Sequence, residues 1–298
     1  MQSKKLIVIA GPTAVGKTEV ALRLAEYFKT EIISADSRQI YKEMEIGTAK
    51  PSKDELSRIR HHFINTHSIN QSYDAGTYGR DALALLQRLF KTHDILVLCG
   101  GSGLYIKAVL EGFDDMPEVP PGMREQIIAE YELNGLSLLQ HEVMSIDPEY
   151  FKQVDQNNPH RLIRAIELYR ASGKLTSQLR AKEKRAHDFD VVKIGLQHDR
   201  EKLYERIDRR MDVMIEQGLF EEAKGFFLKR QLNALQTVGY REVFEYLEGN
   251  YDRDEAIRLL KRNTRRYAKR QLTWFKRDVE MKWFSPDQVE EIIELIDS

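Results

Sequence analysis

Residues 11–18 have the spacing G-x-x-x-x-G-K-T, which is the pattern of a P-loop. Gly11 and Gly16 allow backbone conformations that other residues rarely adopt, so the loop can wrap its N–H groups around a diphosphate at a helix N-terminus. Lys17 adds a positive charge, and the hydroxyl of Thr18 is a ligand for Mg²⁺. The stretch predicts a site for a phosphate compound, but it leaves open which compound binds and which reaction follows.

The segments on either side of this loop predict the elements that a P-loop requires. Residues 6–10 are a short aliphatic run, typical of a buried parallel strand. From Glu19 onward the apolar residues recur at steps of three and four, which predicts a helix: Val20, Leu24, Tyr27 and Phe28. The order strand, glycine loop, helix supports the P-loop interpretation.

Two further strands are expected to end beside the loop. Residues 31–35 predict a strand that ends at Asp36 and Ser37, and residues 95–99 predict another that runs into the glycine-rich turn around Ser102. Functional side chains in open parallel sheets lie just past the carboxyl ends of strands, so we favour a functional Asp36 over a turn-capping one. For the glycine turn at Ser102, a site and a plain tight turn explain the residues equally well.

These patterns predict an α/β fold, with a P-loop NTPase-like parallel sheet flanked by helices and an all-helical insertion domain. A strand returns at residues 191–197, after the proline-rich segment DDMPEVPPGM and a stretch without strand patterns. We expect residues 1–115 and 188–298 to form the core and residues 116–187 to form the insertion. In the insertion, Arg161 and Arg164 fit either a phosphate contact or a solvated helix face.

A predicted helix at residues 200–217 carries an arginine where an apolar residue is expected. Its stripe at helical spacing consists of Leu203, Ile207, Arg210 and Met214. An arginine on a buried stripe is costly unless it is paired, and a diphosphate held by the P-loop would pair it. We therefore favour a functional Arg210 over a structural ion pair, with Arg206 and Arg209 as weaker candidates because they lie off the stripe.

Residues 257–277 contain many Lys and Arg and no acidic residue. On a helical wheel, one face is apolar: Ile257, Leu260, Ala268, Leu272 and Phe275. Another face, which we call the basic ridge, consists of Arg258, Arg262, Arg265, Lys269 and Lys276. A basic ridge in a chain of near-neutral charge indicates contact with a nucleic-acid backbone, and a membrane-surface helix is the alternative.

The composition limits the remaining classes. The 298 residues carry a net charge of −1, and no apolar run approaches the roughly 20 residues of a membrane span. The single Cys99 excludes an intrachain disulfide and a cysteine-cluster zinc site, and His61, His62 and His67 lack metal-ligand spacing. We expect a cytoplasmic protein.

Several motifs together closely resemble the tRNA dimethylallyltransferases, over nearly the whole chain and in the same order: GPTAVGKT, SADSRQIYKEMEIGTAKP, GGSGLYIKA, NNPHRLIRAIE, RIDRRMD, QTVGYREV and TRRYAKRQLTWFKR. These enzymes move a dimethylallyl group from dimethylallyl diphosphate to N6 of adenosine 37, beside the tRNA anticodon, and release diphosphate. The resemblance implies a P-loop that holds a prenyl diphosphate with Mg²⁺, and Thr18 as the metal ligand. No zinc-finger segment is present, which fits the bacterial type. The stretch at residues 218–236 is shorter than in many relatives.

The resemblance also implies roles for individual residues. Asp36 matches the general base, Arg210 the arginine that braces the diphosphate, and Thr13 a third catalytic position. The diphosphate loop comprises Gly11, Pro12, Thr13, Ala14, Val15, Gly16, Lys17 and Thr18. Together with the basic ridge, the expected tRNA-binding residues are Asp36, Ser37, Arg38, Gln39, Ser102, Arg124, His160, Arg161, Leu162, Ile163, Arg164, Arg262, Arg265 and Lys269.

The expected partners are the anticodon stem-loop of tRNA and dimethylallyl diphosphate, with a monomeric chain and no obligate protein partner. A P-loop kinase of nucleotides or small metabolites would account for residues 6–36 but not for the basic ridge. A prenyltransferase acting on free AMP would leave both the insertion and the ridge without a purpose. A non-catalytic RNA-binding factor that uses a nucleotide as a switch is the alternative from another class.

Overall fold

The computed structural model describes residues 4–112, 117–179 and 186–298. The chain divides into two compact units, one of residues 1–110 and 186–298 and the other of residues 111–185. The predicted domain boundary between residues 115 and 116 and part of the predicted proline-rich linker lie outside the described residues. None of the helices described here combines the length and the apolar character that crossing a membrane requires.

The larger unit is built on a six-stranded sheet with the order β3-β2-β4-β1-β5-β6, and every neighbouring pair is parallel. The strands are β1 (Lys5–Ala10), β2 (Ile32–Ser34), β3 (His61–His62), β4 (Ile95–Gly100), β5 (Asp190–Leu196) and β6 (Lys282–Phe284). The predicted α/β class is confirmed. The sequence pattern had indicated β1, β2, β4 and β5, whereas β3 and β6, of two and three residues, were not predicted.

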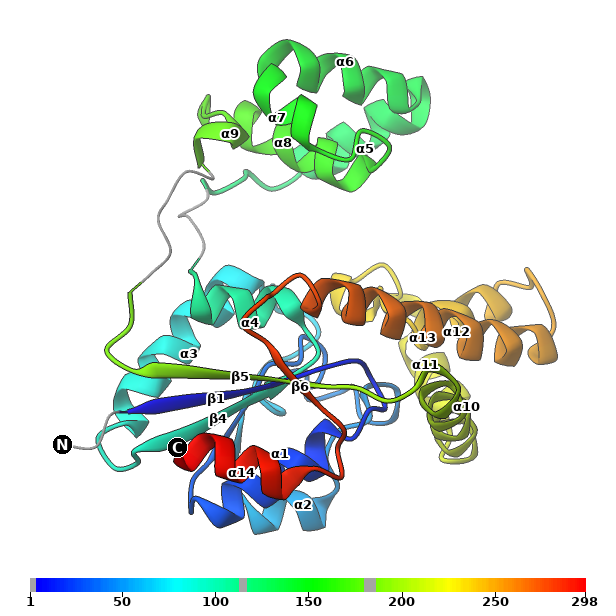
Figure 1. Cartoon of the computed structure of the whole chain (residues 1–298). Helices are drawn as coiled ribbons and strands as arrows, with labels where there is room; N and C mark the ends of the chain where they lie inside the picture. Colours follow the sequence, from blue (N-terminus) through cyan, green and yellow to red (C-terminus); the bar gives the residue numbers. More distant parts are fainter. Residues whose placement is uncertain (1–3, 113–116, 180–185) are drawn as a thin grey trace. The chain divides into compact units, whose positions relative to one another are not determined.

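Helices cover both faces of this sheet, which is why the central strands β1 and β4 are apolar except for Lys5 at the start of β1 (Figure 1). One face packs against α1 (Lys17–Tyr27) and α14 (Val289–Asp297), and the other packs against α3 (Ala75–Leu89) and α4 (Gly103–Leu110). Successive residues of β1 alternate between the two cores, as the pleat requires. The short α2 (Lys53–Arg58) lies on the same side as α1 (Figure 1).

The start of α3 differs from the prediction. The apolar residues Leu83, Leu86 and Phe90 recur at helical spacing and by themselves predict a helix over residues 78–91, but the helix begins one turn earlier, with Asp74 accepting a hydrogen bond from the Thr77 amide at 2.8 Å as the N-cap. Glycines at 76 and 79 weaken the local helix signal. Gly79 is there for packing, since a Cβ at this position would lie 2.9 Å from the Cβ of Ala108 on α4.

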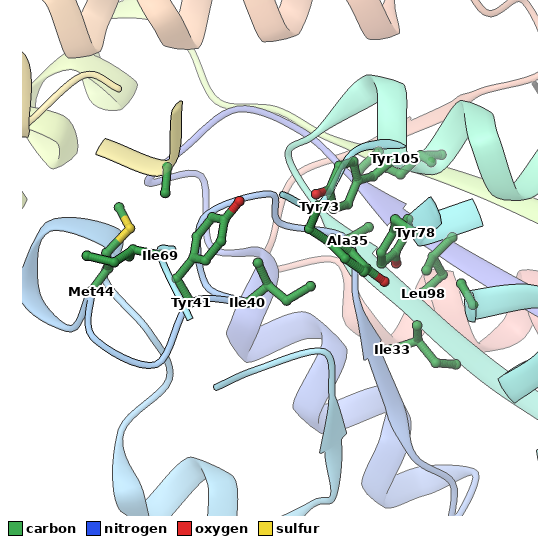
Figure 2. Close-up of a cluster of buried hydrophobic side chains, with 14 of the residues drawn as sticks. Ile33, Ala35, Ile40, Tyr41, Met44, Ile69, Tyr73, Tyr78, Leu98 and Tyr105 are labelled. Carbon is green, nitrogen blue, oxygen red and sulfur yellow. The ribbon is translucent and has the colours of Figure 1, made fainter. Parts of the chain in front are cut away.

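An aromatic cluster supports the carboxyl end of β2, as Figure 2 shows. The rings of Tyr78 and Tyr105 are stacked with centroids 4.2 Å apart, and the hydroxyl of Tyr78 donates a hydrogen bond to the Ser34 carbonyl at 2.9 Å. Burial raises the pKa of Tyr78 well above its ordinary value, so it stays a neutral donor. The cluster therefore fixes the point where the chain leaves β2 toward Asp36.

The rest of this unit is helical: α10 (Arg200–Glu216), α11 (Leu219–Phe226), α12 (Tyr240–Leu247) and α13 (Arg253–Phe275), with the 3-10 turns η1 (Ile46–Thr48), η2 (Phe227–Lys229) and η3 (Asn233–Leu235). The buried side of α13 differs in part from the predicted apolar face. It consists of Ala256, Leu260, Thr264, Ala268, Gln271 and Phe275, whereas Ile257 and Leu272 are only partly buried. Two of the buried positions are thus polar.

The smaller unit contains α5 (Met123–Asn134), α6 (Leu136–Ile146), α7 (Pro148–Gln153), α8 (Pro159–Ser172) and α9 (Thr176–Leu179). Its apolar side chains form a core of their own, with Ile127, Leu139 and Leu162 fully buried. Pro159 stands at the first turn of α8, and Gly173 ends the helix in a left-handed conformation at φ 69°.

Candidate active site

The P-loop turns between β1 and α1 in a shape that only small residues permit. A Cβ on Gly11 would lie 2.7 Å from the backbone oxygen of Leu196 on the neighbouring strand β5. Gly16 has φ 110° immediately before α1, a left-handed conformation that side chains rarely adopt. The tight turn directs the first amides of α1 into the space above the sheet, where an anion binds favourably.

Lys17 is held by the loop itself. Its ammonium donates hydrogen bonds to the carbonyls of Pro12 at 2.7 Å and Gly11 at 3.1 Å. Loss of solvation lowers the pKa of Lys17 to about 8; nearby Cys99 and Asp36 oppose this shift, and Arg210 adds to it. The ammonium can exchange its carbonyl partners for phosphate oxygens, because both are acceptors at the same end of the side chain.

A cavity of about 590 Å³ opens above this loop. Of the residues predicted from the sequence, it brings together Thr13, Ala14, Gly16, Lys17, Thr18, Asp36, Gln39 and Arg210. Three cationic side chains from α10 also face it: Arg206, Arg209 and Arg210. This arrangement suits a ligand with several negative charges at the P-loop end.

The Asp36 carboxylate caps a turn and also lines the cavity. Its Oδ1 accepts hydrogen bonds from the backbone amides of Arg38 at 2.9 Å and Gln39 at 3.3 Å, which caps the turn after β2. The same carboxyl group lines the cavity. Within the described residues, Oδ2 has no hydrogen-bond partner. One oxygen thus orients the group and the other can accept a proton.

Arg210 lies in the cavity, but the predicted stripe was wrong by one residue. The buried positions of α10 are Leu203, Ile207, Met211 and Met214, and Arg210 lies beside them, partly buried. Burial lowers the pKa of its guanidinium, with Asp36 opposing the shift. Arg206, off the stripe as expected, donates from Nε to the Ala14 carbonyl at 2.8 Å and so supports the P-loop from outside.

Gln271 on α13 is a site residue that the sequence reasoning missed. Its Oε1 accepts a hydrogen bond from the Thr13 amide at 2.9 Å, and its Nε2 donates to the Gly101 carbonyl at 2.9 Å. A Cβ at Gly101 would lie 2.4 Å from Nε2, so this glycine makes room for the amide. A polar residue within a buried stripe was the available signal, the same argument that had identified Arg210.

A loop held by Glu222 forms another wall of the cavity. The Glu222 carboxylate on α11 accepts hydrogen bonds from three consecutive amides at 2.8–2.9 Å and from the Tyr240 hydroxyl at 2.5 Å. Those amides belong to Glu45, Ile46 and Gly47, directly before the cavity residues Thr48 and Ala49. Gln39 Nε2 donates hydrogen bonds to the carbonyls of Thr48 and Ala49. These bonds connect the loop to the turn that holds Asp36.

Thr48 lines the cavity, but Lys50, two residues further along the chain, does not. The Lys50 ammonium donates to the Tyr41 carbonyl at 2.7 Å and to Oδ1 of Asn65 at 2.5 Å. Lys50 therefore links the loop at residues 42–51 to Tyr41 and Asn65.

A second cavity of about 420 Å³ adjoins the first and shares Gly101, Tyr267 and Gln271 with it. It is lined by the predicted residues Ser37, Arg38 and Ser102 and by aromatic side chains, among them Tyr105 and Trp274. The hydroxyl of Ser102 accepts a hydrogen bond from the Ser37 amide at 2.9 Å, which links the glycine turn after β4 to the turn after β2. Burial raises the pKa of Tyr267 to about 12, so a neutral hydroxyl stands at the junction.

The three histidines between β2 and α3 make local contacts in the framework. His62 Nε2 bonds to Glu31 at 2.5 Å, His61 Nδ1 bonds to the Ile59 carbonyl at 2.8 Å, and His67 packs against Tyr73. In the parts of the chain that the structure describes, no cluster of metal-ligating side chains is found.

Two of the residues predicted to contact RNA have side chains that are buried in the smaller unit. Leu162 and Ile163 are 0% and 2% exposed, because the apolar positions of α8 face that unit's core. His160, Arg161 and Arg164 are exposed on the same helix. Arg124 and Arg164 share the buried carboxylate of Glu167, at 2.7 Å and 3.2 Å.

The basic ridge on α13 is partly neutralised. Arg258 pairs with Glu255, and Nη1 of Arg265 donates to both carboxylate oxygens of Asp208 on α10, at 2.6 and 2.7 Å. Arg262 Nε donates to Asn263 at 3.3 Å. Lys269 is exposed and has no acidic partner among the described residues.

A family model described as IPP transferase matches residues 39–278, which is most of the chain. The chain belongs to the IPP transferase family. Among its relatives in this family, a protein of Cytophaga hutchinsonii called tRNA dimethylallyltransferase is 50% identical over 99% of this chain and 97% of its own length. A protein of Bacteroides fragilis called tRNA dimethylallyltransferase 1 is 47% identical over 98% and 97%.

Solved structures of the family share the fold. The full-length tRNA isopentenylpyrophosphate transferase of Bacillus halodurans has a TM-score of 0.72 and 36% identity, covering 99% of this chain and 96% of its own. A eukaryotic dimethylallyltransferase acting on tRNA has a TM-score of 0.76 and 27% identity, covering 91% and 70%. The chain therefore has the fold of the IPP transferase family over nearly its whole length.

Proposed function

We propose that this chain is a tRNA dimethylallyltransferase, which transfers a dimethylallyl group from dimethylallyl diphosphate to N6 of adenosine 37 in tRNA. The observation that supports this most is the pair of adjoining cavities. One is cationic and built on a P-loop, and the other is rich in aromatic side chains. A reaction between a diphosphate ester and a flat base needs both, joined at one point. The close relatives named for this activity support the same proposal.

The P-loop and Arg210 hold the diphosphate in this proposal. Loop amides, the Lys17 ammonium and the guanidinium face the charge that develops on the leaving group, and they face it before the reaction begins. We assign the Thr13 hydroxyl to the leaving oxygen, since its amide is already fixed by Gln271.

Transfer is a substitution at the first carbon of the dimethylallyl group. The adenine N6 forms the new C–N bond, the C–O bond to diphosphate breaks, and its electron pair leaves with the diphosphate. N6 is a poor nucleophile because its lone pair is delocalised into the ring, so a base must take its proton. We assign this role to Asp36, whose orientation is fixed by the Arg38 and Gln39 amides.

Mg²⁺ fits the residues at the P-loop. Thr18 lines the cavity with a hydroxyl oxygen, and Mg²⁺ commonly takes one or two protein oxygens while phosphates and waters complete its shell. Thr18 would hold the ion, which would neutralise charge on the leaving diphosphate.

The adenosine has to leave its stack to enter the second cavity, where aromatic side chains and the Ser37–Ser102 pair surround it in this proposal. We assign the exposed cations of α8 and α13 to the tRNA backbone, because most protein–nucleic acid contacts are to phosphates. The protein acts as a cytoplasmic monomer without an obligate protein partner in this proposal.

One experiment separates this function from its alternatives. Dimethylallyl diphosphate or ATP is supplied together with either unmodified tRNA or free AMP, and the products are identified by mass. The proposal expects a dimethylallyl adduct only with dimethylallyl diphosphate and tRNA. A phosphorylated product would indicate a kinase, an adduct on AMP would indicate a free-nucleotide prenyltransferase, and RNA binding without any product would indicate a binding factor.

A further inference from the structure

A third cavity, of about 610 Å³, lies at the carboxyl ends of β5 and β6. Its walls come from the segment after β5, the first turn of α10, the last turns of α13, and the segment after β6. It shares no lining residue with the two cavities of the candidate active site. Ligands of open parallel sheets bind outside the carboxyl ends of strands, so this is a position where a ligand is expected.

The cavity is positively charged. Its cationic lining residues are Arg200, Lys202, Lys269 and Lys276, and all four are exposed. In the described parts of the chain, none of them forms an ion pair. Nearer the start of α13 the cations are paired: Arg258, Lys261 and Arg265 all have carboxylate partners.

Few acidic groups oppose these four charges. Asp199 lines the cavity at the start of α10. Asp287 lies near Lys202 and His198, and the Ser285 hydroxyl donates a hydrogen bond to its carboxylate. The cavity therefore keeps a net positive charge that an anionic ligand could neutralise.

Aromatic side chains accompany the cations. The Arg200 guanidinium lies 5.2 Å from the ring centroid of Tyr204, and the Lys276 ammonium lies 5.8 Å from that of Trp283. Trp283 is firmly seated, because a Cβ at Gly195 would lie 2.7 Å from its ring. Cations next to rings, in a cavity wide enough for a base, are the features with which proteins bind single nucleotides.

We propose that this third cavity binds a nucleotide, with its phosphate on the lysines and its base beside Tyr204 and Trp283. The inference rests on the proposed function and extends it: the occupant is a nucleotide of the bound tRNA other than the reacting adenosine. An RNA strand is favoured over a free nucleotide because all four cations are exposed and Lys269 continues the basic ridge of α13.

The first test measures binding of a labelled, unmodified anticodon stem-loop by fluorescence anisotropy at several salt concentrations. Lys269→Ala combined with Lys276→Ala should weaken binding roughly tenfold and flatten the salt slope by about 0.7, the contribution of the one single-strand phosphate that the two lysines hold. The matched control replaces Lys53 and Lys91, two exposed lysines distant in sequence, and should leave the slope unchanged. Equal slopes for both pairs would overturn the proposal.

A second variant distinguishes a nucleotide cavity from a bare phosphate patch. Tyr204→Leu should reduce stem-loop affinity by roughly 5-fold to 100-fold, the range for loss of one stacked base, while the salt slope stays at its parent value. An unchanged affinity would show that no base enters the cavity. Binding of dimethylallyl diphosphate, followed by calorimetry, should remain intact in all these variants. A parent protein that binds no tRNA would instead refute the proposed function.

The source of the nucleotide is decided by tryptophan emission. The chain has two tryptophans, so Trp274→Phe leaves Trp283 as the single reporter. We expect the stem-loop to quench this emission and AMP to leave it unchanged. Saturable quenching by AMP would overturn the RNA assignment, and no quenching at RNA concentrations that saturate the anisotropy signal would overturn the cavity assignment. If Trp274→Phe fails to fold, competition decides the source: AMP should not displace the labelled stem-loop from the parent protein, and displacement that Tyr204→Leu weakens would overturn the RNA assignment.

Discussion

The backbone amide of Thr13 donates a hydrogen bond to Oε1 of Gln271 at 2.9 Å, across 258 positions of the chain. Through its other amide atom, Gln271 also holds the Gly101 carbonyl. One buried side chain on α13 thereby fixes the P-loop relative to the glycine turn after β4, and the two cavities of the candidate active site meet at this residue.

Gln271→Leu should therefore damage both stability and turnover. The change leaves the Thr13 amide and the Gly101 carbonyl without their partner, and each buried unsatisfied group costs about 1–3 kcal/mol. We expect the free energy of unfolding, measured with urea, to fall by about 2–6 kcal/mol, the sum for the two groups. Gln140→Leu is the control, because that side chain is in the smaller unit. A stability equal to that of the parent would contradict the bridging role.

Asp36→Asn should remove the general base and preserve the turn after β2. Asn retains an Oδ1 that can accept the Arg38 and Gln39 amides, so the local shape survives. Loss of a general base should reduce single-turnover transfer by roughly 10² to 10⁴, or about 3–5 kcal/mol of barrier, while affinity for dimethylallyl diphosphate stays the same. Transfer within a few-fold of the parent would show that Asp36 acts only as a cap.

Arg210→Ala should behave differently from Asp36→Asn. The guanidinium faces the diphosphate both before and during the reaction, so its loss should weaken ligand binding and slow transfer together. Calorimetry and single-turnover transfer measure the two effects separately. Arg209→Ala is the matched control from the same helix, exposed at the cavity margin, and should have the smaller effect. An effect confined to the transfer rate would contradict ground-state contact with the diphosphate.

Binding of dimethylallyl diphosphate should weaken as pH rises through 8. Burial lowers the pKa of Lys17 from 10.5 to about 8 in the free protein, so above pH 8 the lysine must take up a proton before it can pair with phosphate. We expect affinity to fall by up to about tenfold per pH unit there. Proton uptake should appear as a binding enthalpy that depends on the buffer. Lys17→Met should bind weakly with little dependence on pH in this range.

The lowered pKa of Lys17 also predicts how the free energy of unfolding changes with pH. Between about pH 8 and 10.5 the unfolded chain binds more protons at Lys17 than the folded chain does, so this group's contribution to stability rises with pH in that window. Lys17→Met should remove that part of the rise in urea unfolding experiments.

Glu222→Gln should loosen the loop beside the cavity. The carboxylate accepts three backbone amides and the Tyr240 hydroxyl, and a neutral amide with one acceptor oxygen cannot satisfy all four donors. We expect a lower melting temperature and a roughly tenfold loss of kcat/KM for tRNA transfer, since hydrogen bonds to a charged group contribute about 1.5–3 kcal/mol. Glu221→Gln, the exposed neighbour, is the control. A loss equal in both variants would contradict the anchoring role.

The P-loop, the strand before it and the helix after it could be predicted from the sequence because all their determinants lie in one continuous stretch of the chain, Lys5–Tyr27. Asp36 could be predicted because a strand end is a local feature and parallel strands end at one edge. The assignments on α8 were less accurate. A motif carried over as a block, from His160 to Arg164, included Leu162 and Ile163, which helical periodicity turns toward the core.

The sequence by itself thus determined the phosphate-binding end of the site, since its residues are consecutive and their conformations are set by local sterics and backbone hydrogen bonding. Only the tertiary structure decided how the other walls are held. Gln271 reaches Thr13 from 258 residues away, and Glu222 reaches Gly47 from 175 residues away. No local pattern marks such pairs, because a buried hydrogen bond depends on which helices pack together, and that depends on the burial of side chains along the whole chain.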